Sequence, residues 1–299
     1  MQSFKAFFAL VVLGSGCIQT ALAQVIIGAT GPEAAPHRMQ QWLVPTSDPG
    51  TAAHALLFRP PGDGPFRLAV IAHASVQNEL RRAQMPQPEY LALSAWLVAR
   101  GFAVLVPERP GHGATGGKYL EDQGGCDEAD YLGAGRAAAG TISAALDYLR
   151  GQSFIRPDGA IIVGHSAGGW GALALAHDNP QGVSNIIAFA PGRGGHANDL
   201  PNQVCAPQTL ISAAAEFGKG ARVPVTWLVA ANDTYFSLSL SRQIADAFRG
   251  GGDKVDFRAL AASGRDGHWL AETEGGVRIA GSELGRALKL AAPKPDKKR

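Results

Sequence analysis

The chain has 299 residues, of which 46% are hydrophobic and 17% charged, and its formal net charge at pH 7 is +2. This length suffices for one large core in a single domain, and no linker or internal repeat divides the sequence. The nearly neutral charge disfavours a polyanionic partner such as nucleic acid, and we expect the basic end at residues 294–299 to be a solvated tail.

The first 23 residues have the pattern of a secretory signal peptide. Lys5 makes the start positive, residues 6–13 form a short apolar run, and Ala21-Leu22-Ala23 is a small-x-small cleavage site. The apolar run is shorter than the roughly 20 residues of a membrane span, and no later run is longer. We therefore expect an exported protein, periplasmic or secreted, that is cleaved near Ala23 and leaves residues 24–299 as one domain.

Cys17 raises the alternative of a lipoprotein anchor. Such an anchor is expected to have an aliphatic residue three positions before the cysteine, where this chain has Gly14. A cleaved signal peptide is therefore the preferred interpretation.

Apolar runs alternate with helical patterns along the rest of the chain. The expected strands are 53–59, 68–72, 102–106, 160–163, 185–189, 223–229 and 255–260. The expected helices lie near 90–100, 129–149, 169–177, 238–248 and 276–290. Continuous apolar strands separated by helices predict an α/β fold with a mostly parallel sheet covered on both faces. Residues 191–222 are rich in Gly, Asn and Pro, and we expect them to form at most a small cap over an open site.

The most informative motif is Gly-His-Ser-Ala-Gly at residues 164–168, directly after the apolar run 160–163. A G-x-S-x-G between a buried strand and a helix makes a sharp turn that exposes the serine hydroxyl above the sheet. The helix expected at 169–177 would direct its N-terminal N–H groups and its dipole toward developing negative charge. We interpret Ser166 as a catalytic nucleophile; the alternative is a glycine-rich turn with a chance serine.

A serine nucleophile requires a histidine base and an acid that orients it, in the chain order Ser, Asp or Glu, His. Asp233 follows the apolar run 223–229, and His268 lies in a glycine-containing loop after the last expected strand. We predict Asp233 as the acid and His268 as the base. Asp266 is a rival acid, but it lies only two residues from His268 and is badly placed to reach Nδ1 of that ring.

The other histidines have weaker claims to be the base. His165 is next to the nucleophile and is expected to pack beside the turn, while His73 and His112 could line the site. The remaining ones, for which a structural role is expected, are His37, His54, His177 and His196.

Acyl transfer also needs backbone donors for the oxyanion, and losing one such donor costs roughly 10²–10³ in rate. One donor is the N–H of the residue after the nucleophile, which is Ala167. The second comes from the loop after an earlier strand, where this chain has His73-Ala74-Ser75. We expect the N–H of Ser75, with Ala74 as the alternative because it replaces the usual glycine.

These motifs together make the chain similar to the α/β-hydrolase superfamily, and within it to the dienelactone-hydrolase-like branch of bacterial serine esterases. The resemblance rests on residues 73–75, on Arg-Pro-Gly-His-Gly at 109–113, on 164–168, on Ala-Asn-Asp at 231–233 and on Asp-Gly-His at 266–268. It implies the α/β-hydrolase fold and the triad. The dienelactone reaction itself is not carried over, because those enzymes are expected to use cysteine where this chain has Ser166, and because this chain is expected to be exported.

The sequence thus predicts an exported serine hydrolase, with carboxylic ester hydrolysis through an acyl-enzyme as the first choice. Short-to-medium acyl esters are expected as substrates, with the aromatic Trp170 and Tyr235 in an acyl wall. A peptidase of the prolyl-oligopeptidase type and an inactive hydrolase-fold binding protein are the alternatives. No cofactor and no metal cluster is expected, and the oligomeric state is not readable.

Two cysteines remain after cleavage of the signal peptide, Cys126 and Cys205. No C-x-x-C motif accompanies them, and an isolated pair in an oxidising compartment favours a disulfide. We expect this bridge to tie the cap to the rim of the site.

Overall fold

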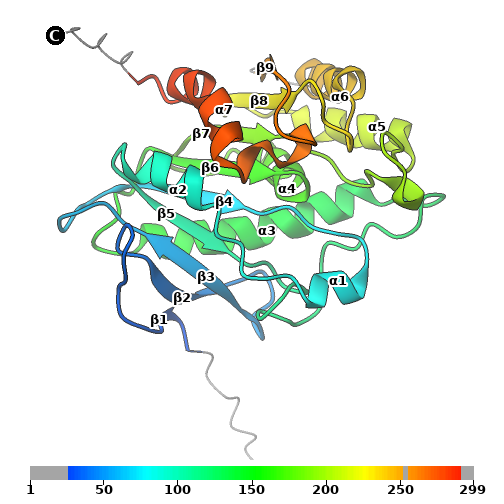
Figure 1. Ribbon diagram of the computed structural model, residues 1–299. Helices are drawn as coiled ribbons and strands as arrows, with labels where there is room; N and C mark the ends of the chain where they lie inside the picture. Colours follow the sequence, from blue (N-terminus) through cyan, green and yellow to red (C-terminus); the bar gives the residue numbers. More distant parts are fainter. Residues whose placement is uncertain (1–25, 252–254, 291–299) are drawn as a thin grey trace, which may run out of the picture.

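In the computed structural model of the protein, residues 26–251 and 255–290 are described (Figure 1). The expected signal peptide at residues 1–23 and the basic end at 294–299 lie outside the described residues. Within the described ranges, no helix is long and apolar enough to cross a membrane.

One central sheet runs through the molecule, with the strand order β1-β2-β3-β5-β4-β6-β7-β8-β9 (Figure 1). The strands are β1 (Gly28–Ala29), β2 (Gln40–Pro45), β3 (Ala52–Phe58), β4 (Arg67–Ala72), β5 (Phe102–Pro107), β6 (Ala160–His165), β7 (Val183–Phe189), β8 (Val225–Ala230) and β9 (Val255–Leu260). β1, β2, β3 and β5 pair antiparallel, and every pair from β5 to β9 is parallel. The mostly parallel sheet expected from the sequence is confirmed.

Helices cover both faces of this sheet (Figure 1). One face packs against α3 (Tyr131–Arg150), α4 (Ala167–His177), α5 (Pro207–Gly218) and α6 (Leu238–Gly251), and the other against α2 (Leu91–Val98) and α7 (Glu274–Ala287). The short helices α1 (Glu79–Ala83), η1 (Ala197–Asp199) and η2 (Gly267–Ala271) lie in the loops.

The central strands are buried on both faces, which explains their continuous apolar runs. In β4, Leu68 and Val70 point into the core beneath α3 and α4, whereas Ala69 and Ile71 point into the core beneath α2 and α7. Because β4, β6, β7, β8 and β9 are parallel, the loops at their carboxyl ends all meet at one edge of the sheet.

The stretch 191–222 differs from the small cap that the sequence predicts. Its second half is α5, which buries Leu210, Ala213, Ala214 and Phe217 and packs beside α4 and α6. Spacings of three and four residues place these side chains on one helix face, and α5 is the crossover between β7 and β8. Only residues 191–206 are left to reach over the site.

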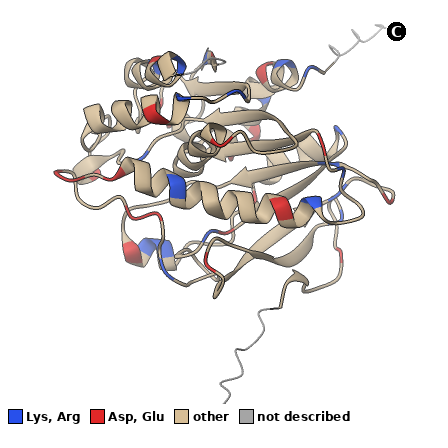
Figure 2. Ribbon diagram, turned by 180° about the vertical axis from the view of Figure 1, so that it is seen from behind, with Lys and Arg blue, Asp and Glu red and all other residues tan. Residues whose placement is uncertain are grey.

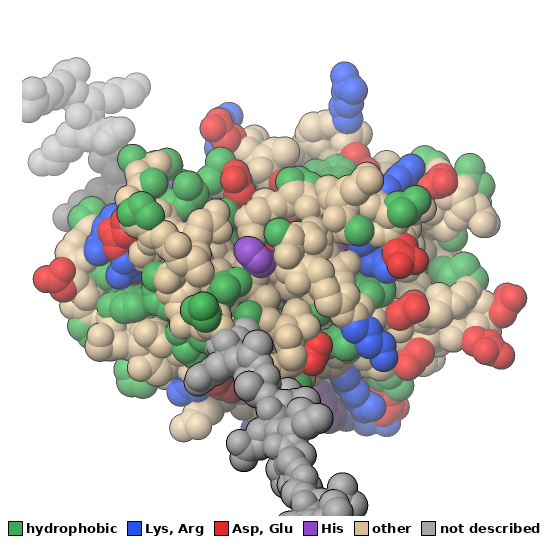
Figure 3. Space-filling view, turned by 90° about the horizontal axis from the view of Figure 1, so that it is seen from below, with side chains coloured by type: hydrophobic (Ala, Val, Ile, Leu, Met, Phe, Trp, Pro, Cys, Tyr) green, Lys and Arg blue, Asp and Glu red, His purple; other side chains and the backbone are tan. Residues whose placement is uncertain are grey.

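Charged side chains of both signs are interspersed on the surface. α3, which lies in front in Figure 2, carries exposed Arg136 and Asp147 on its outer side. The face seen from below in Figure 3 likewise mixes acidic and basic side chains.

Candidate active site

Ser166 lies in a strained turn between β6 and α4, with φ 53° and ψ −117°. The turn depends on small neighbours: a Cβ at Gly164 would lie 2.5 Å from Gly169 Cα, and one at Gly168 would lie 2.2 Å from the carbonyl oxygen of Ala72. Real side chains do not tolerate such contacts, so glycine is required at both positions. The close approach of Ala72 also brings the loop after β4 against the serine.

Ser166, His268 and Asp233 form one connected set at the carboxyl edge of the sheet. His268 Nε2 lies 3.0 Å from Ser166 Oγ, and His268 Nδ1 lies 3.1 Å from Asp233 Oδ2. The serine is 6% exposed, the aspartate 4% and the histidine 1%, so the contacts are shielded from water. Nε2 can accept the serine proton while Nδ1–H donates to the carboxylate.

The loop after β8 fixes the orientation of the Asp233 carboxylate. Its Oδ1 accepts the backbone N–H groups of Tyr235 and Phe236, both at 2.8 Å, which leaves Oδ2 directed at His268. Burial lowers the pKa of His268, and the hydrogen bond to Asp233 opposes this shift. The imidazole is therefore neutral, and able to accept a proton, over most of the physiological pH range.

Asp266, the rival acid, has another role in the loop after β9. Its Oδ1 accepts the backbone N–H of His268 at 3.0 Å and that of Thr234 at 3.1 Å, and its Oδ2 accepts the Thr234 hydroxyl at 2.6 Å. Asp266 thus caps the turn of η2 and holds the β8 and β9 loops together, whereas Asp233 contacts the imidazole ring.

Both residues expected to supply oxyanion donors line one cavity together with Ser166. Ala167 is the first residue of α4, and Ser75 lies in the loop that approaches the turn. The N–H of Ala74 donates to the Tyr90 hydroxyl at 3.1 Å, so it is already used. Within the part of the chain that the structure describes, the N–H of Ser75 makes no hydrogen bond, and we keep it as the proposed second donor.

A cavity of about 470 Å³ opens at Ser166 and Ala167. Polar side chains line much of it, among them Gln77 and Asn78 from the loop after β4 and Arg81 from α1. Ser75 and Val76 separate it from a second cavity of about 620 Å³, which is lined by Trp269 and by residues 85–91. Ser75 and Val76 thus line both cavities, of which the first contains the nucleophile.

The two aromatic residues expected in the acyl wall have different positions. Tyr235 lines the Ser166 cavity and stacks on the His268 ring, with centroids 4.0 Å apart. Trp170 is fully buried: its indole N–H donates to the Tyr131 carbonyl at 2.8 Å, and its ring packs on Phe217. The expectation for Trp170 was wrong, because this side of α4 faces the core.

Sequence reasoning missed the polar groups behind His268. Tyr90 Oη lies 2.9 Å from His165 Nδ1, and His165 Nε2–H donates to the His268 carbonyl oxygen at 2.8 Å. His165 therefore packs beside the turn, as expected, and also holds the backbone of the candidate base. Nothing in the sequence indicated Tyr90, because this residue lies 75 positions before His165 in the chain and no motif surrounds it.

A buried ion network supports the wall of the cavity near Arg193, and the sequence did not indicate it either. Arg109 and Arg193 both bind the Glu121 carboxylate, with Arg193 Nη1 3.0 Å from Oε2. Burial raises the pKa of Glu121, but the two guanidinium groups outweigh this effect and lower it to about 2. Glu121 is therefore ionised throughout the physiological range. In the described residues, no group of three or more side chains forms a candidate metal site.

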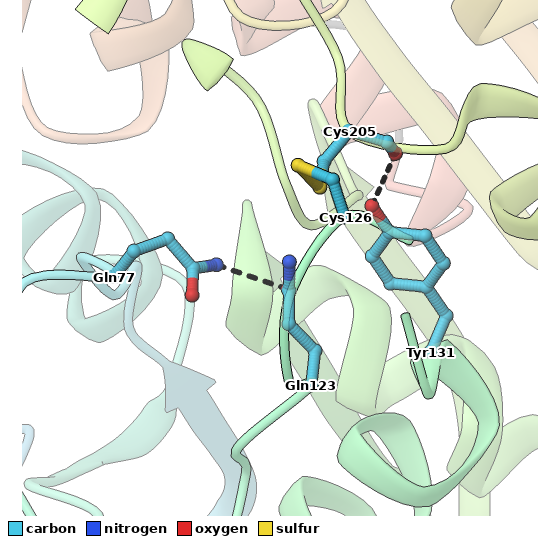
Figure 4. The surroundings of a disulfide bond; sticks show 5 residues. All are labelled: Gln77, Gln123, Cys126, Tyr131 and Cys205. Atoms are coloured by element: carbon cyan, nitrogen blue, oxygen red, sulfur yellow. Dashed lines mark hydrogen bonds between the residues drawn. A yellow bond between two sulfur atoms is a disulfide. The ribbon is translucent and has the colours of Figure 1, made fainter. Parts of the chain in front are cut away.

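A disulfide joins Cys126 and Cys205 at the rim of the same cavity (Figure 4). Their Cα atoms lie 5.0 Å apart, and the Tyr131 hydroxyl donates to the Cys205 carbonyl oxygen. In Figure 4, the amide of Gln77 also donates to Gln123, at 2.9 Å. The bridge thus ties the loop after β7 to the loop between β5 and α3, as the sequence predicted.

Comparison with known proteins identifies the fold of this chain. Residues 142–216, about a quarter of the sequence, match the family model described as "Putative esterase". None of the curated proteins matches the chain.

Three similar solved structures cover most of the chain at low identity. The esterase Pf2001 of Pyrococcus furiosus is 13% identical with a TM-score of 0.58, over 84% of this chain and 91% of that one. Est1E of Butyrivibrio proteoclasticus, solved with ferulic acid bound, is 15% identical with a TM-score of 0.57, over 83% and 98%. A "Putative Dienelactone Hydrolase" of Klebsiella pneumoniae is 15% identical with a TM-score of 0.53, over 85% and 99%.

These structural neighbours confirm the α/β-hydrolase fold that the sequence motifs predicted. The family model that matches part of the chain is one of esterases.

Proposed function

We propose that the protein is an exported serine esterase that hydrolyses carboxylic esters through Ser166, His268 and Asp233. One observation carries the proposal: the contacts run without a break from Ser166 Oγ to His268 Nε2 and from Nδ1 to the Asp233 carboxylate. Two further features support it: the strained turn at Ser166, and the Ser75 N–H, which makes no hydrogen bond within residues 26–251 and 255–290.

The reaction proceeds in two halves. His268 takes the proton of Ser166 as Oγ attacks the carbonyl carbon, and Asp233 stabilises the imidazolium that forms. The N–H groups of Ala167 and Ser75 bind the oxyanion. The carbon–oxygen bond to the alcohol then breaks, and His268 gives its proton to the leaving alcohol. In the second half His268 deprotonates a water, which cleaves the acyl-enzyme, releases the carboxylic acid and restores Ser166.

The site favours small, water-soluble esters. A lipase lid hides a wide apolar groove, whereas only residues 191–206 reach over this cavity, and its volume of about 470 Å³ is partly lined by polar side chains. Tyr235 supplies an aromatic wall for the acyl group. Selectivity among acyl chains should be graded, since a pocket discriminates by about 1–3 kcal/mol per methylene.

Export is supported by the disulfide at the rim, because such bonds persist in oxidising compartments. The expected leader at residues 1–23 agrees with it. Expression of the full chain in a Gram-negative host, followed by cell fractionation and N-terminal sequencing, tests this part. Protein recovered from the cytoplasm with its N-terminus intact would contradict export.

The central test combines a fluorophosphonate probe with a series of p-nitrophenyl esters from acetate to palmitate. We expect labelling of Ser166, highest kcat/KM on the shorter esters, and loss of both labelling and turnover in Ser166→Ala. Ser184→Ala is the matched control, because its hydroxyl donates to the Ala160 carbonyl at the far, amino end of the sheet.

Other outcomes would replace the proposal. A preference for peptides over every ester would favour a peptidase, and a peak on emulsified triglycerides would favour a lipase. A stable protein with neither labelling nor hydrolysis would be an inactive binding domain.

A further inference from the structure

The Ser75 side chain is bound to His112, a residue from a different loop. Ser75 Oγ lies 2.7 Å from His112 Nε2, and His112 Nδ1 lies 3.0 Å from the Arg109 carbonyl oxygen and 3.2 Å from that of Pro110. Carbonyl oxygens only accept hydrogen bonds, so Nδ1 carries the proton and Nε2 presents its lone pair. The Ser75 hydroxyl is therefore the donor.

His112 is itself held rigidly. It is fully buried, and its ring packs edge-on against Tyr119 and His73, with centroids 5.5 and 4.8 Å away. Gly111 and Gly113, both with positive φ, turn the chain sharply on either side of it, and a Cβ at Gly111 would lie 2.6 Å from Tyr119 Cα. Burial also lowers the pKa of His112 to about 4, which keeps Nε2 an acceptor in neutral solution.

Two tethers thus fix the backbone beside Ser166. The Tyr90 hydroxyl accepts the N–H of Ala74, and His112 accepts the hydroxyl of Ser75. The N–H of Ser75 is left between them with no partner among the described residues. A donor for an oxyanion acts only when it is aimed in advance at about 2.7–3.1 Å, so a fixed backbone matters here.

We propose that His112 is a positioning residue: through the Ser75 hydroxyl it aims the Ser75 N–H at the oxyanion. The inference rests on the proposed esterase function and adds a role for the Arg-Pro-Gly-His-Gly motif at residues 109–113. His112 is buried and acts only through Ser75, whereas Ser75 lines the cavity with the nucleophile.

The test distinguishes the hydrogen bond between the Ser75 hydroxyl and His112 from the Ser75 N–H that would bind the oxyanion. Ser75→Ala keeps the backbone N–H and removes the hydroxyl, and His112→Asn removes the acceptor at the Nε2 position. His112→Gln keeps an acceptor there, because its longer side chain carries Oε1 to about the place of Nε2. We expect kcat to fall by about 10- to 100-fold in the first two variants, less than the roughly 10²–10³ for loss of a donor, and to stay near wild type in His112→Gln.

Two readouts distinguish positioning from a merely structural role. KM for p-nitrophenyl acetate should stay within about twofold, and the affinity for a boronic acid analogue of the tetrahedral intermediate should fall by the same factor as kcat. The Ser75→Ala/His112→Asn double variant should lose no more kcat than either single variant, because both substitutions break the same hydrogen bond.

Several results would overturn the inference. A Ser75→Ala enzyme with wild-type kcat would overturn it even if His112→Asn fails to fold. A double variant whose loss of kcat equals the product of the two single losses would also overturn it. Ser184→Ala serves again as the control, here for removal of a hydrogen-bonded serine hydroxyl far from the site. Failure of the proposed function would look different, since either the wild type would hydrolyse no ester or Ser166→Ala would retain activity in the same assay.

Discussion

The phenol ring of Tyr235 lies nearly parallel to the imidazole of His268, with centroids 4.0 Å apart and planes inclined by 19°. His196 stacks on Tyr235 as well, at 3.6 Å and 8°, so the tyrosine ring lies between two imidazoles. The electron-rich face of an aromatic ring attracts a cation. In the proposed mechanism, Tyr235 would therefore stabilise the imidazolium that forms when His268 takes the proton of Ser166.

Replacement of Tyr235 tests this contact. Tyr235→Phe keeps the aromatic face and should retain kcat/KM within about twofold, whereas Tyr235→Leu should lose about 3- to 30-fold, as expected for a contact worth roughly 0.5–2 kcal/mol. Steady-state kinetics with p-nitrophenyl acetate measure both. Equal activity in the Phe and Leu variants would show that the aromatic face contributes nothing.

The choice of acid is tested by a matched pair of aspartate variants. Asp233→Asn should lower kcat by about 10⁴, because the amide no longer holds the imidazole in the tautomer with Nδ1–H. Asp266→Asn should stay within about tenfold of wild type, since Asp266 binds the backbone and Thr234 and not the ring. The reverse order of losses would assign the acid to Asp266.

The pH dependence of kcat/KM reports the candidate base. His268 must be neutral to accept the serine proton, and burial lowers its pKa below the ordinary value of about 6.5. Activity should therefore rise with pH along a limb whose midpoint lies below 6.5, and should be constant at neutral pH. A midpoint above 7 in stopped-flow or steady-state profiles would contradict the effect of burial at this residue.

The sequence predicted the parts of the site that depend on local order along the chain. The turn at residues 164–168 needs glycines at fixed spacing around Ser166, and Asp233 and His268 each follow a strand in the required order. The alternation of strands and helices also predicted the parallel sheet, because strands and helices differ in the spacing at which hydrophobic residues recur along the chain.

The parts that the sequence missed depend on contacts between distant segments. Ser75 and His112 are 37 residues apart, and Glu121 meets Arg193 across 72 residues, so no local spacing reveals either contact. α5 was missed because the Gly, Asn and Pro residues of the stretch 191–222 indicated an irregular cap, while the helix lies only in its second half. Trp170 was assigned to the wrong side of α4 because that helix is buried almost all round and has no polar face to orient it.

Removal of the disulfide should destabilise the protein without removing the fold. Cys126 and Cys205 are separated by 79 residues, and the chain-entropy model gives about 4 kcal/mol for a loop of this length. The Cys126→Ser/Cys205→Ser variant should lose free energy of unfolding by up to that amount in urea titrations followed by circular dichroism. Dithiothreitol should lower the midpoint of the wild type and leave that of the double variant unchanged. Two free thiols in denatured, exported wild-type protein, or identical midpoints for both proteins without reductant, would show that the bridge is absent or contributes no stability.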